Sequence, residues 1–278
     1  MNTFQNRSTV RNTLQPIALE NLRSRVPSIF AEHPSEAVSN RYTFIPTTRV
    51  IDVLGAQGWL PVKAEQCKVR RPGNLDFTKH MIRFQNSQVG EIDGEEVPEI
   101  ILTNAHNAVA AYCLSVGIFR FVCSNGLIVA DATFASIKIR HSGFTDDAII
   151  EATARVADSV PKLGATVRTM KQIELSSDEQ LAFAKSAKLL KFDEDAPVDP
   201  AKLLTSRRST DEAPSLWNSY NRVQENLVRG GIRTFDKETG RRNKTRAITS
   251  INEDSRVTKA LWTLAAEMAR IKGVALAS

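Results

Sequence analysis

Residues 110–131, AAYCLSVGIFRFVCSNGLIVAD, decide the fold class. The stretch is largely apolar and rich in β-branched and aromatic residues, which indicates two buried strands. Asn125-Gly126 interrupts it, and this dipeptide is a strong hairpin signal because both residues tolerate positive φ. The pattern predicts two antiparallel core strands joined at Asn125-Gly126, with Cys123 as a small buried side chain in one of them.

Other segments extend this sheet. The stretches with strand character are RYTFIPT (41–47), WLPVKAEQCKVRR (59–71), DFTKHMIRFQN (76–86), PEIILTNAHN (98–107) and FASIKIRHSG (134–143). One short helix is expected within TTRVIDVLGAQGW (47–59). No connection among the strands holds a helix long enough for a parallel crossover, so we expect about five to seven antiparallel strands.

The pattern changes to helix from Thr145, where apolar residues recur at helical spacing. We therefore predict an α+β fold with an antiparallel, sheet-rich N-terminal half and a helical C-terminal half packed on it. Residues 1–38 are predicted to be a poorly ordered arm with a helical turn near Ile17 to Arg23. Residues 39–144 are assigned to the sheet and its short helix, and residues 145–278 to a mainly helical part with a basic loop or hairpin at 232–250.

Positive charge is segregated along the 278 residues, whose net charge is +6. Between 201 and 250 there are eleven Lys and Arg against five acidic residues, so this stretch alone carries a charge equal to the total. A second basic stretch, CKVRRPGNLDFTKHMIRF, spans 67–84, while acids gather at 91–99 and 193–199. This separation is expected if one face of the protein meets phosphates.

These two basic stretches and one predicted strand supply the candidate nucleic-acid contacts. Alternate residues of a strand face one side, so the sheet could present a row of cations. The candidates are Lys68, Arg70, Arg71, Lys79, Arg83, Lys138, Arg140, Arg229, Arg233, Arg241, Arg242, Lys244 and Arg246. Three aromatic residues, Trp59, Trp217 and Tyr220, are candidates for base stacking or for a subunit interface. A core role is favoured for Trp59, whereas Trp217 and Tyr220 lie on a mixed polar and aromatic side of a predicted helix.

Catalytic motifs are weak by comparison. Cys123 would need a base such as His106 or His141, oriented by Asp131, but no helix follows the turn as in a nucleophile elbow. Neither a P-loop nor a G-x-G-x-x-G pattern occurs. We therefore expect no enzymatic activity, no cofactor and no metal.

An acidic loop offers a second, weaker possibility. The carboxylates are Glu91, Asp93, Glu95, Glu96 and Glu99. They lack the spacing of a known cation-binding loop, so a solvated loop is expected rather than a metal site.

The sequence also bears on location. No apolar run approaches the roughly 18 residues that span a bilayer, and no secretory signal is seen, so a cytoplasmic protein without a membrane partner is expected. Cys67, Cys113 and Cys123 form no C-x-x-C pair, which favours reduced thiols.

Four motifs together carry a resemblance. RYTFIPTTRVIDVL (41–54), FRFVCSNGLIVAD (119–131), IKIRHSG (137–143) and WNSYNRVQENLVRGGI (217–232) resemble a family of uncharacterised proteins encoded on plasmids, phages and prophages. The resemblance implies a mobile-element setting and no specific activity. The order of a short helix, RVIDVLGAQGW, followed by antiparallel strands and a long helix is also similar to that of single-strand annealing recombinases, which hold DNA in a basic groove.

Taken together, the charge pattern and the resemblance favour a single-stranded DNA-binding protein of a mobile genetic element. Its most specific form is an ATP-independent single-strand annealing recombinase that acts as a homo-oligomer. Two alternatives stay open: an inhibitor or binding module that acts on a host defence protein, and a metal-dependent nuclease.

Overall fold

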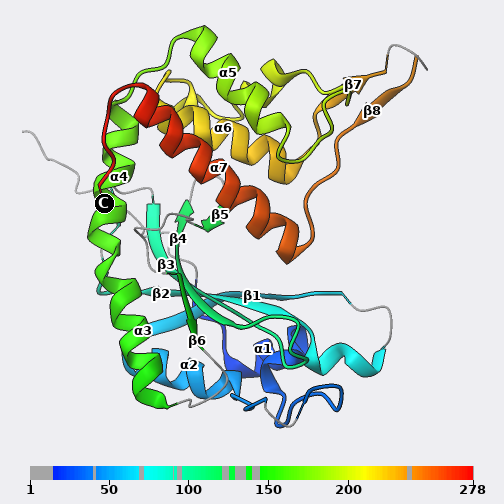
Figure 1. Ribbon diagram of the computed structural model, residues 1–278, viewed down its shortest axis with the longest axis vertical. Helices are drawn as coiled ribbons and strands as arrows, with labels where there is room; N and C mark the ends of the chain where they lie inside the picture. Colours follow the sequence, from blue (N-terminus) through cyan, green and yellow to red (C-terminus); the bar gives the residue numbers. More distant parts are fainter. Residues whose placement is uncertain are drawn as a thin grey trace, which may run out of the picture.

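The computed structural model has three layers, with helices below and above a central antiparallel sheet (Figure 1). It describes residues 15–39, 42–68, 72–89, 91–92, 96–120, 125–128, 136–139, 145–236 and 240–277. The α+β class predicted from the sequence is confirmed. None of the described helices is both long enough and apolar enough to cross a membrane.

Within the described residues the sheet has six strands, and each pairs antiparallel with its neighbours. In chain order they are β1 Trp59–Gln66, β2 His80–Asn86, β3 Glu96–Asn104, β4 Tyr112–Arg120, β5 Asn125–Ile128 and β6 Ser136–Ile139. β4 pairs with both β5 and β6: β5 pairs with the C-terminal half of β4, and β6 pairs with its N-terminal half. The predicted antiparallel arrangement is therefore correct.

Both faces of the sheet are covered, and β2 is buried along its whole length. On one face, Ile82, Phe84 and Ile100 pack with Val50 and Leu54 in the main hydrophobic core. The opposite face turns Met81, Arg83 and Gln85 toward the C-terminal helices, because successive side chains of a strand alternate. The first face is mainly apolar, whereas the second mixes charge with apolar groups.

The lower layer consists of α1 Leu19–Arg25, the 3-10 turn η1 Pro27–Phe30 and α2 Thr47–Ala56, with a further 3-10 turn, η2 Pro72–Phe77, before β2. Two consecutive helices, α3 Asp146–Asp158 and α4 Val160–Gln172, run along one side of the molecule from the lower layer to the upper one (Figure 1). Thr145 caps α3 by accepting a hydrogen bond from the Ala148 amide.

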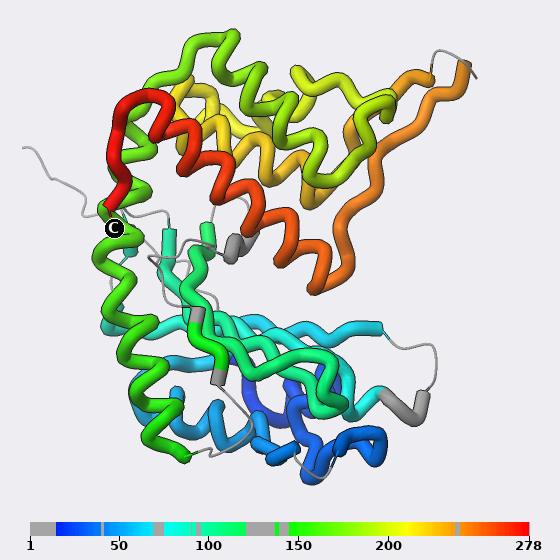
Figure 2. Tube along the Cα trace, viewed as in Figure 1, coloured from blue at the N-terminus to red at the C-terminus, as the bar shows by residue number. Residues whose placement is uncertain are grey.

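The upper layer is built from three longer helices and a small hairpin. Its elements are α5 Ser177–Lys188, η3 Pro200–Leu204, η4 Ser209–Asp211, α6 Leu216–Arg229, β7 Arg233–Phe235, β8 Arg242–Lys244 and α7 Ile251–Ile271. α7 lies between the sheet and the rest of this layer (Figure 2). Ile251 at its start packs on Met81 and Ile101 of the sheet.

Three sequence-based assignments of local structure are wrong. The segment from Ile17 to residue 38 is not a poorly ordered arm, because its residues Leu22, Val26 and Ile29 are almost fully buried in the core. The segment 42–46 contains no strand and leads directly into α2. Asn125 and Gly126 are not the bend, because they belong to β5 and pair with Arg120 and Phe119; the connection that includes Cys123 lies outside the described residues.

A buried hydroxyl joins the lower helices to the sheet. Thr47, the first residue of α2, is fully buried, and its Oγ1 lies 3.0 Å from Nε2 of His80, 3.1 Å from Nε2 of His106 and 3.0 Å from the hydroxyl of Tyr112. Nδ1 of His80 donates to the Thr78 carbonyl, which can only accept, so Nε2 of the neutral ring accepts the Thr47 proton. Thr47 in turn accepts from Tyr112 and His106.

Replacing Thr47 by Val keeps the shape of the side chain and removes this shared partner. Thr47→Val should lower the free energy of unfolding by about 2–4 kcal/mol, because Tyr112 and both imidazoles then lose a buried hydrogen bond. Urea denaturation measures the effect. Thr48→Val, at the next and less buried position of α2, should change stability by about 0.5 kcal/mol or less; equal losses in the two variants would contradict this role.

The buried imidazole of His80 should make stability depend on pH. Burial, followed by the neighbouring His106, lowers its pKa from 6.5 to about 3. Between these values the unfolded chain binds a proton that the folded chain excludes, so this contribution to stability is complete above about pH 6.5 and is lost as the pH falls toward 3.

Unfolding measured at several pH values tests this linkage. In His80→Gln, the number of protons taken up on unfolding in the acidic range should fall by up to one. The slope of the free energy of unfolding against pH should therefore decrease by up to about 1.4 kcal/mol per pH unit. An unchanged slope would show that His80 is not the group responsible.

Candidate nucleic-acid interface

The β7–β8 hairpin gathers four of its side chains on one face. Its register pairs Arg233 with Lys244 and Phe235 with Arg242. Directly opposed residues in an antiparallel pair share a face, and so do residues two apart on one strand. Arg233, Phe235, Arg242 and Lys244 therefore form a common surface, called the hairpin face below.

The cations of the hairpin face have no acidic partner within the described part of the chain. Arg233, Arg242 and Lys244 are all exposed, and none of them forms an ion pair with a described carboxylate. Like charges directly opposite one another destabilise a β-ribbon by several tenths of a kcal/mol or more. The hairpin thus carries a concentrated positive charge that no carboxylate among the described residues neutralises by an ion pair.

The hairpin extends from the upper layer at the end of α6 (Figure 1), and a cavity of about 590 Å³ lies against it. The residues of β7 and β8 line this cavity together with Lys202 from η3. Lys202 also donates from Nζ to the Arg233 carbonyl at 2.9 Å, which ties β7 to η3. Its ammonium group therefore adds a fourth positive charge at this cavity.

The base of the hairpin is fixed by a close backbone contact. α6 ends at Gly230, whose φ is +63°, and a Cβ atom built there would lie 2.6 Å from the carbonyl carbon and oxygen of Arg246. Two backbone hydrogen bonds, Gly231 to Thr245 and Thr245 to Ile232, continue the ladder at this point. Only glycine allows this approach, and it sets the direction in which the hairpin leaves the helix.

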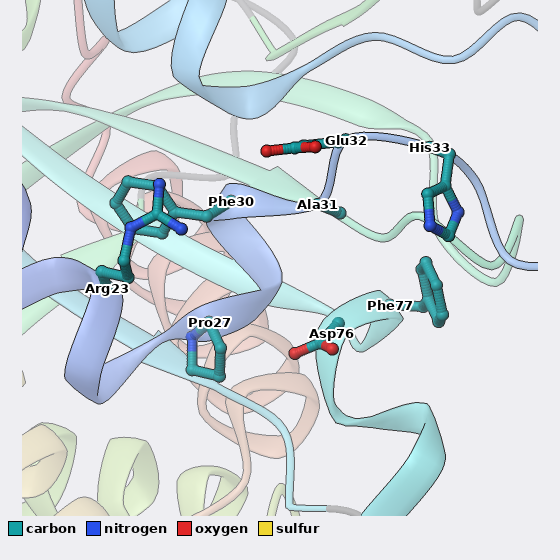
Figure 3. Close-up of a pocket in the computed structure, with 8 residues that line it drawn as sticks. All are labelled: Arg23, Pro27, Phe30, Ala31, Glu32, His33, Asp76 and Phe77. Carbon is teal, nitrogen blue, oxygen red and sulfur yellow. The ribbon is translucent and has the colours of Figure 1, made fainter.

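A second cavity, of about 270 Å³, lies between η1 and η2 (Figure 3). The two phenyl rings that line it already contact other side chains of the protein. The Arg23 guanidinium lies 4.4 Å from the centre of the Phe30 ring, and His33 packs against Phe77 at 5.6 Å between ring centres. Glu32 and Asp76 also face this cavity, so its charge does not favour an anionic ligand. The basic cavity at the hairpin is the better candidate for binding nucleic acid.

The candidate cations on the sheet do not form one exposed row. Arg83 is 2% exposed, and its guanidinium donates to Glu99 at 2.7 Å, so its assignment as a phosphate contact is wrong. Lys79 donates to Asn252 of α7 at 2.7 Å, and Lys138 is exposed opposite Cys113. Lys68 is exposed two residues after the end of β1, whereas Arg70, Arg71 and Arg140 lie outside the described residues.

The three candidate stacking residues belong to the interior. Trp59, Trp217 and Tyr220 are 3%, 0% and 0% exposed, so none of them can stack on a base or form a subunit interface in this conformation. Trp217 and Tyr220 stack on each other at 5.5 Å, and Trp262 meets Tyr220 edge-on. Burial also raises the pKa of the Tyr220 hydroxyl far above its usual range. The polar-aromatic side of α6 is a core surface.

Two residues of the predicted acidic loop are buried in ion pairs instead of solvated. Glu96 accepts from Trp217 Nε1 at 2.9 Å and from Lys171 at 3.1 Å, and Arg120 lies 3.7 Å away. Burial raises the Glu96 pKa, and these partners oppose that shift. Glu99 accepts from Arg83 and, at 3.0 Å, from Gln85. Within the described residues, no group of three His, Cys, Asp or Glu side chains could hold a metal ion.

Comparison with known proteins agrees with the motifs noted in the sequence. Residues 34–262 match the family described as domain of unknown function DUF932. The chain belongs to the DUF932 family. Over 252 residues it is 38% identical to the UPF0380 protein YafZ of Escherichia coli K12 and 37% identical to the UPF0380 protein YfjQ of the same strain. Each match covers 90% of this chain and 91% of the relative, and no solved structure matches it significantly.

The remaining candidate cations of this DUF932 chain surround the hairpin but differ in their surroundings. Arg241 and Arg246 are exposed beside β8. Arg229 is held partly by Glu225 at 3.0 Å, which is also paired with Arg208. The charge of Arg229 is therefore partly neutralised by Glu225, so Arg229 is expected to attract an anionic ligand less strongly than the cations of the hairpin face.

Sequence reasoning missed two residues of the DUF932 hairpin site. Lys202 lies 31 residues before Arg233, and only the fold brings the two together. Phe235 is 51% exposed on the hairpin face. Its signal was present in the alternation of Arg233, Thr234 and Phe235, which places the ring on the side of the cations once a strand is recognised.

Gly230 offers a direct test of how the DUF932 hairpin is anchored. Gly230→Ala should reduce the free energy of unfolding by more than Gly231→Ala, measured by urea denaturation. Both residues have positive φ, so each alanine is strained by about 1–2 kcal/mol, but only the Cβ at 230 meets backbone atoms. Equal losses at the two positions would show that the contact with Arg246 does not fix the hairpin.

Proposed function

We propose that this protein binds single-stranded DNA through the hairpin face. The observation that carries the proposal is that three cations on one face, Arg233, Arg242 and Lys244, are exposed without an acidic partner among the described residues. Lys and Arg side chains that neutralise phosphates supply most of the affinity in non-specific nucleic-acid binding. A projecting hairpin with this charge suits the backbone of a polynucleotide.

Electrostatic repulsion within the free hairpin supports the proposal. Arg233 and Lys244 are opposed in register, so bringing them together costs free energy in the unbound protein. A phosphate placed between such cations removes the repulsion and adds charge-assisted hydrogen bonds. Binding of a polyanion thus relieves an unfavourable interaction that folding alone leaves in place.

The preference for single-stranded DNA and the assignment to a mobile genetic element are inferred from sequence resemblance. The order of short helix, antiparallel strands and long helix is similar to that of single-strand annealing recombinases, and we propose a related role in a mobile genetic element, in the cytoplasm. The nuclease alternative loses support because Glu96 and Glu99 are engaged with Lys171, Trp217, Arg83 and Gln85 and are not available as a paired metal site.

Removing the cations of the hairpin face should weaken DNA binding without unfolding the protein. For the triple variant Arg233→Ala, Arg242→Ala and Lys244→Ala, we expect at least about a tenfold loss of affinity for oligo-dT. The slope of log affinity against log salt should become shallower by up to about 2, since each phosphate contact on a single strand contributes about 0.7. Fluorescence anisotropy at several salt concentrations measures both quantities.

A matched control removes the same charge elsewhere. Arg25, Lys162 and Lys185 are exposed on α1, α4 and α5, and their triple alanine variant should retain most of the affinity and the salt slope. If both triple variants lose affinity equally, binding follows net charge and the hairpin face is not the site. If the wild-type protein does not bind oligo-dT even at low salt, the proposed function is wrong.

Strand annealing as a homo-oligomer is the more specific form of the proposal. Complementary strands labelled with a fluorophore and a quencher should anneal faster with the protein than without it, and ATP should make no difference. Light scattering should show an assembly larger than the monomer in the presence of oligonucleotide. Tight binding by a monomer that does not accelerate annealing would leave a binding protein and exclude the recombinase.

A further inference from the structure

We infer that the hairpin face contains a subsite for one unpaired base, with Phe235 as the stacking surface. The inference rests on the proposed function and deepens it, because it names what the site recognises beyond phosphate. An aromatic ring between cations can stack on any base, since every base has a π-face, while the cations hold the flanking phosphates.

Exposure singles out Phe235. It is 51% exposed, and no other Phe, Tyr or Trp side chain among the residues that the structure describes is as open to solvent. Leaving about half of a phenylalanine side chain in water forgoes about half of the roughly 1.5–3 kcal/mol that its full burial would contribute. The other described large aromatic rings are buried or half-buried, so the hairpin face is where the described surface offers a phenyl ring to a ligand.

Register places this ring among the cations. Phe235 stands opposite Arg242, and the next opposed positions on the same face hold Arg233 and Lys244. Two residues along a strand span about 6.8 Å, so the ring and its neighbouring cations lie within one nucleotide unit of each other. A base on the ring and a phosphate on the cations can therefore be bound at the same time.

The cavity beside the hairpin gives the base room. Its volume, about 590 Å³, lies within the range of pockets that hold small molecules, and Phe235, Arg233 and Lys202 all line it. A base in a duplex has both faces stacked and cannot reach such a ring without leaving the helix. The subsite should therefore favour single strands over duplex.

An oligonucleotide without bases separates this subsite from phosphate binding. Oligo-dT and an abasic deoxyribose-phosphate strand of equal length carry the same phosphates, so a preference for oligo-dT measures the contribution of the bases. Anisotropy with the full-length protein should give a preference between about fivefold and about a hundredfold, the range expected for stacking of one base. Phe235→Leu should abolish this preference, and Phe235→Tyr should retain it.

The variants have distinct expected outcomes. Phe235→Leu keeps an apolar side chain at an exposed position, so its thermal unfolding should match the wild type, and its affinity for the abasic strand should be unchanged. Equal binding of oligo-dT and abasic strand by the wild type, or a preference that survives Phe235→Leu, overturns the subsite while the phosphate contacts stand. Polyglutamate that competes as well as oligo-dT also overturns it. Absence of binding to either strand overturns the proposed function itself.

Discussion

The packing of the upper helices on the sheet depends on the hydrogen bonds and ion pairs of one buried carboxylate, that of Glu96. It is fully buried at the start of β3, and its oxygens meet Trp217 of α6, Lys171 of α4 and Arg120 of β4. An ionised carboxylate without such partners would cost several kcal/mol in this interior. The upper helices cannot separate from the sheet without leaving that charge uncompensated.

A network of further ion pairs extends from Arg120 to the end of α6. Arg120 also donates to Asp211 at 2.6 Å, Arg208 bridges Asp211 and Glu225, and Glu225 reaches Arg229 at the end of α6. The opposite face of the sheet is held differently, by apolar packing and by the neutral hydrogen bonds around Thr47. One face is thus sensitive to removal of a charge, and the other to removal of volume or of a single hydroxyl.

Much of the fold follows from local pattern, and most of the site does not. The strand-like stretches and the lack of long helical connections between them predicted the antiparallel sheet, and Thr145 and Gly230 marked ends of helices that the structure contains. Pattern alone placed Arg83 and Glu99 at the surface, because a polar residue in a strand normally faces water; only the helices packed on the second face explain their burial. Lys202 could not be assigned to the hairpin without the contact between η3 and β7.

α6 is a single uninterrupted helix of 14 residues from Leu216 to Arg229, which is about 21 Å of rigid rod. One end is fastened to the sheet through Trp217 and Glu96, and the other carries the hairpin through Gly230 and the backbone of Arg246. The hairpin is therefore connected through one rigid helix to the buried carboxylate of Glu96, so a change in the position of α6 on the sheet would move the hairpin with it.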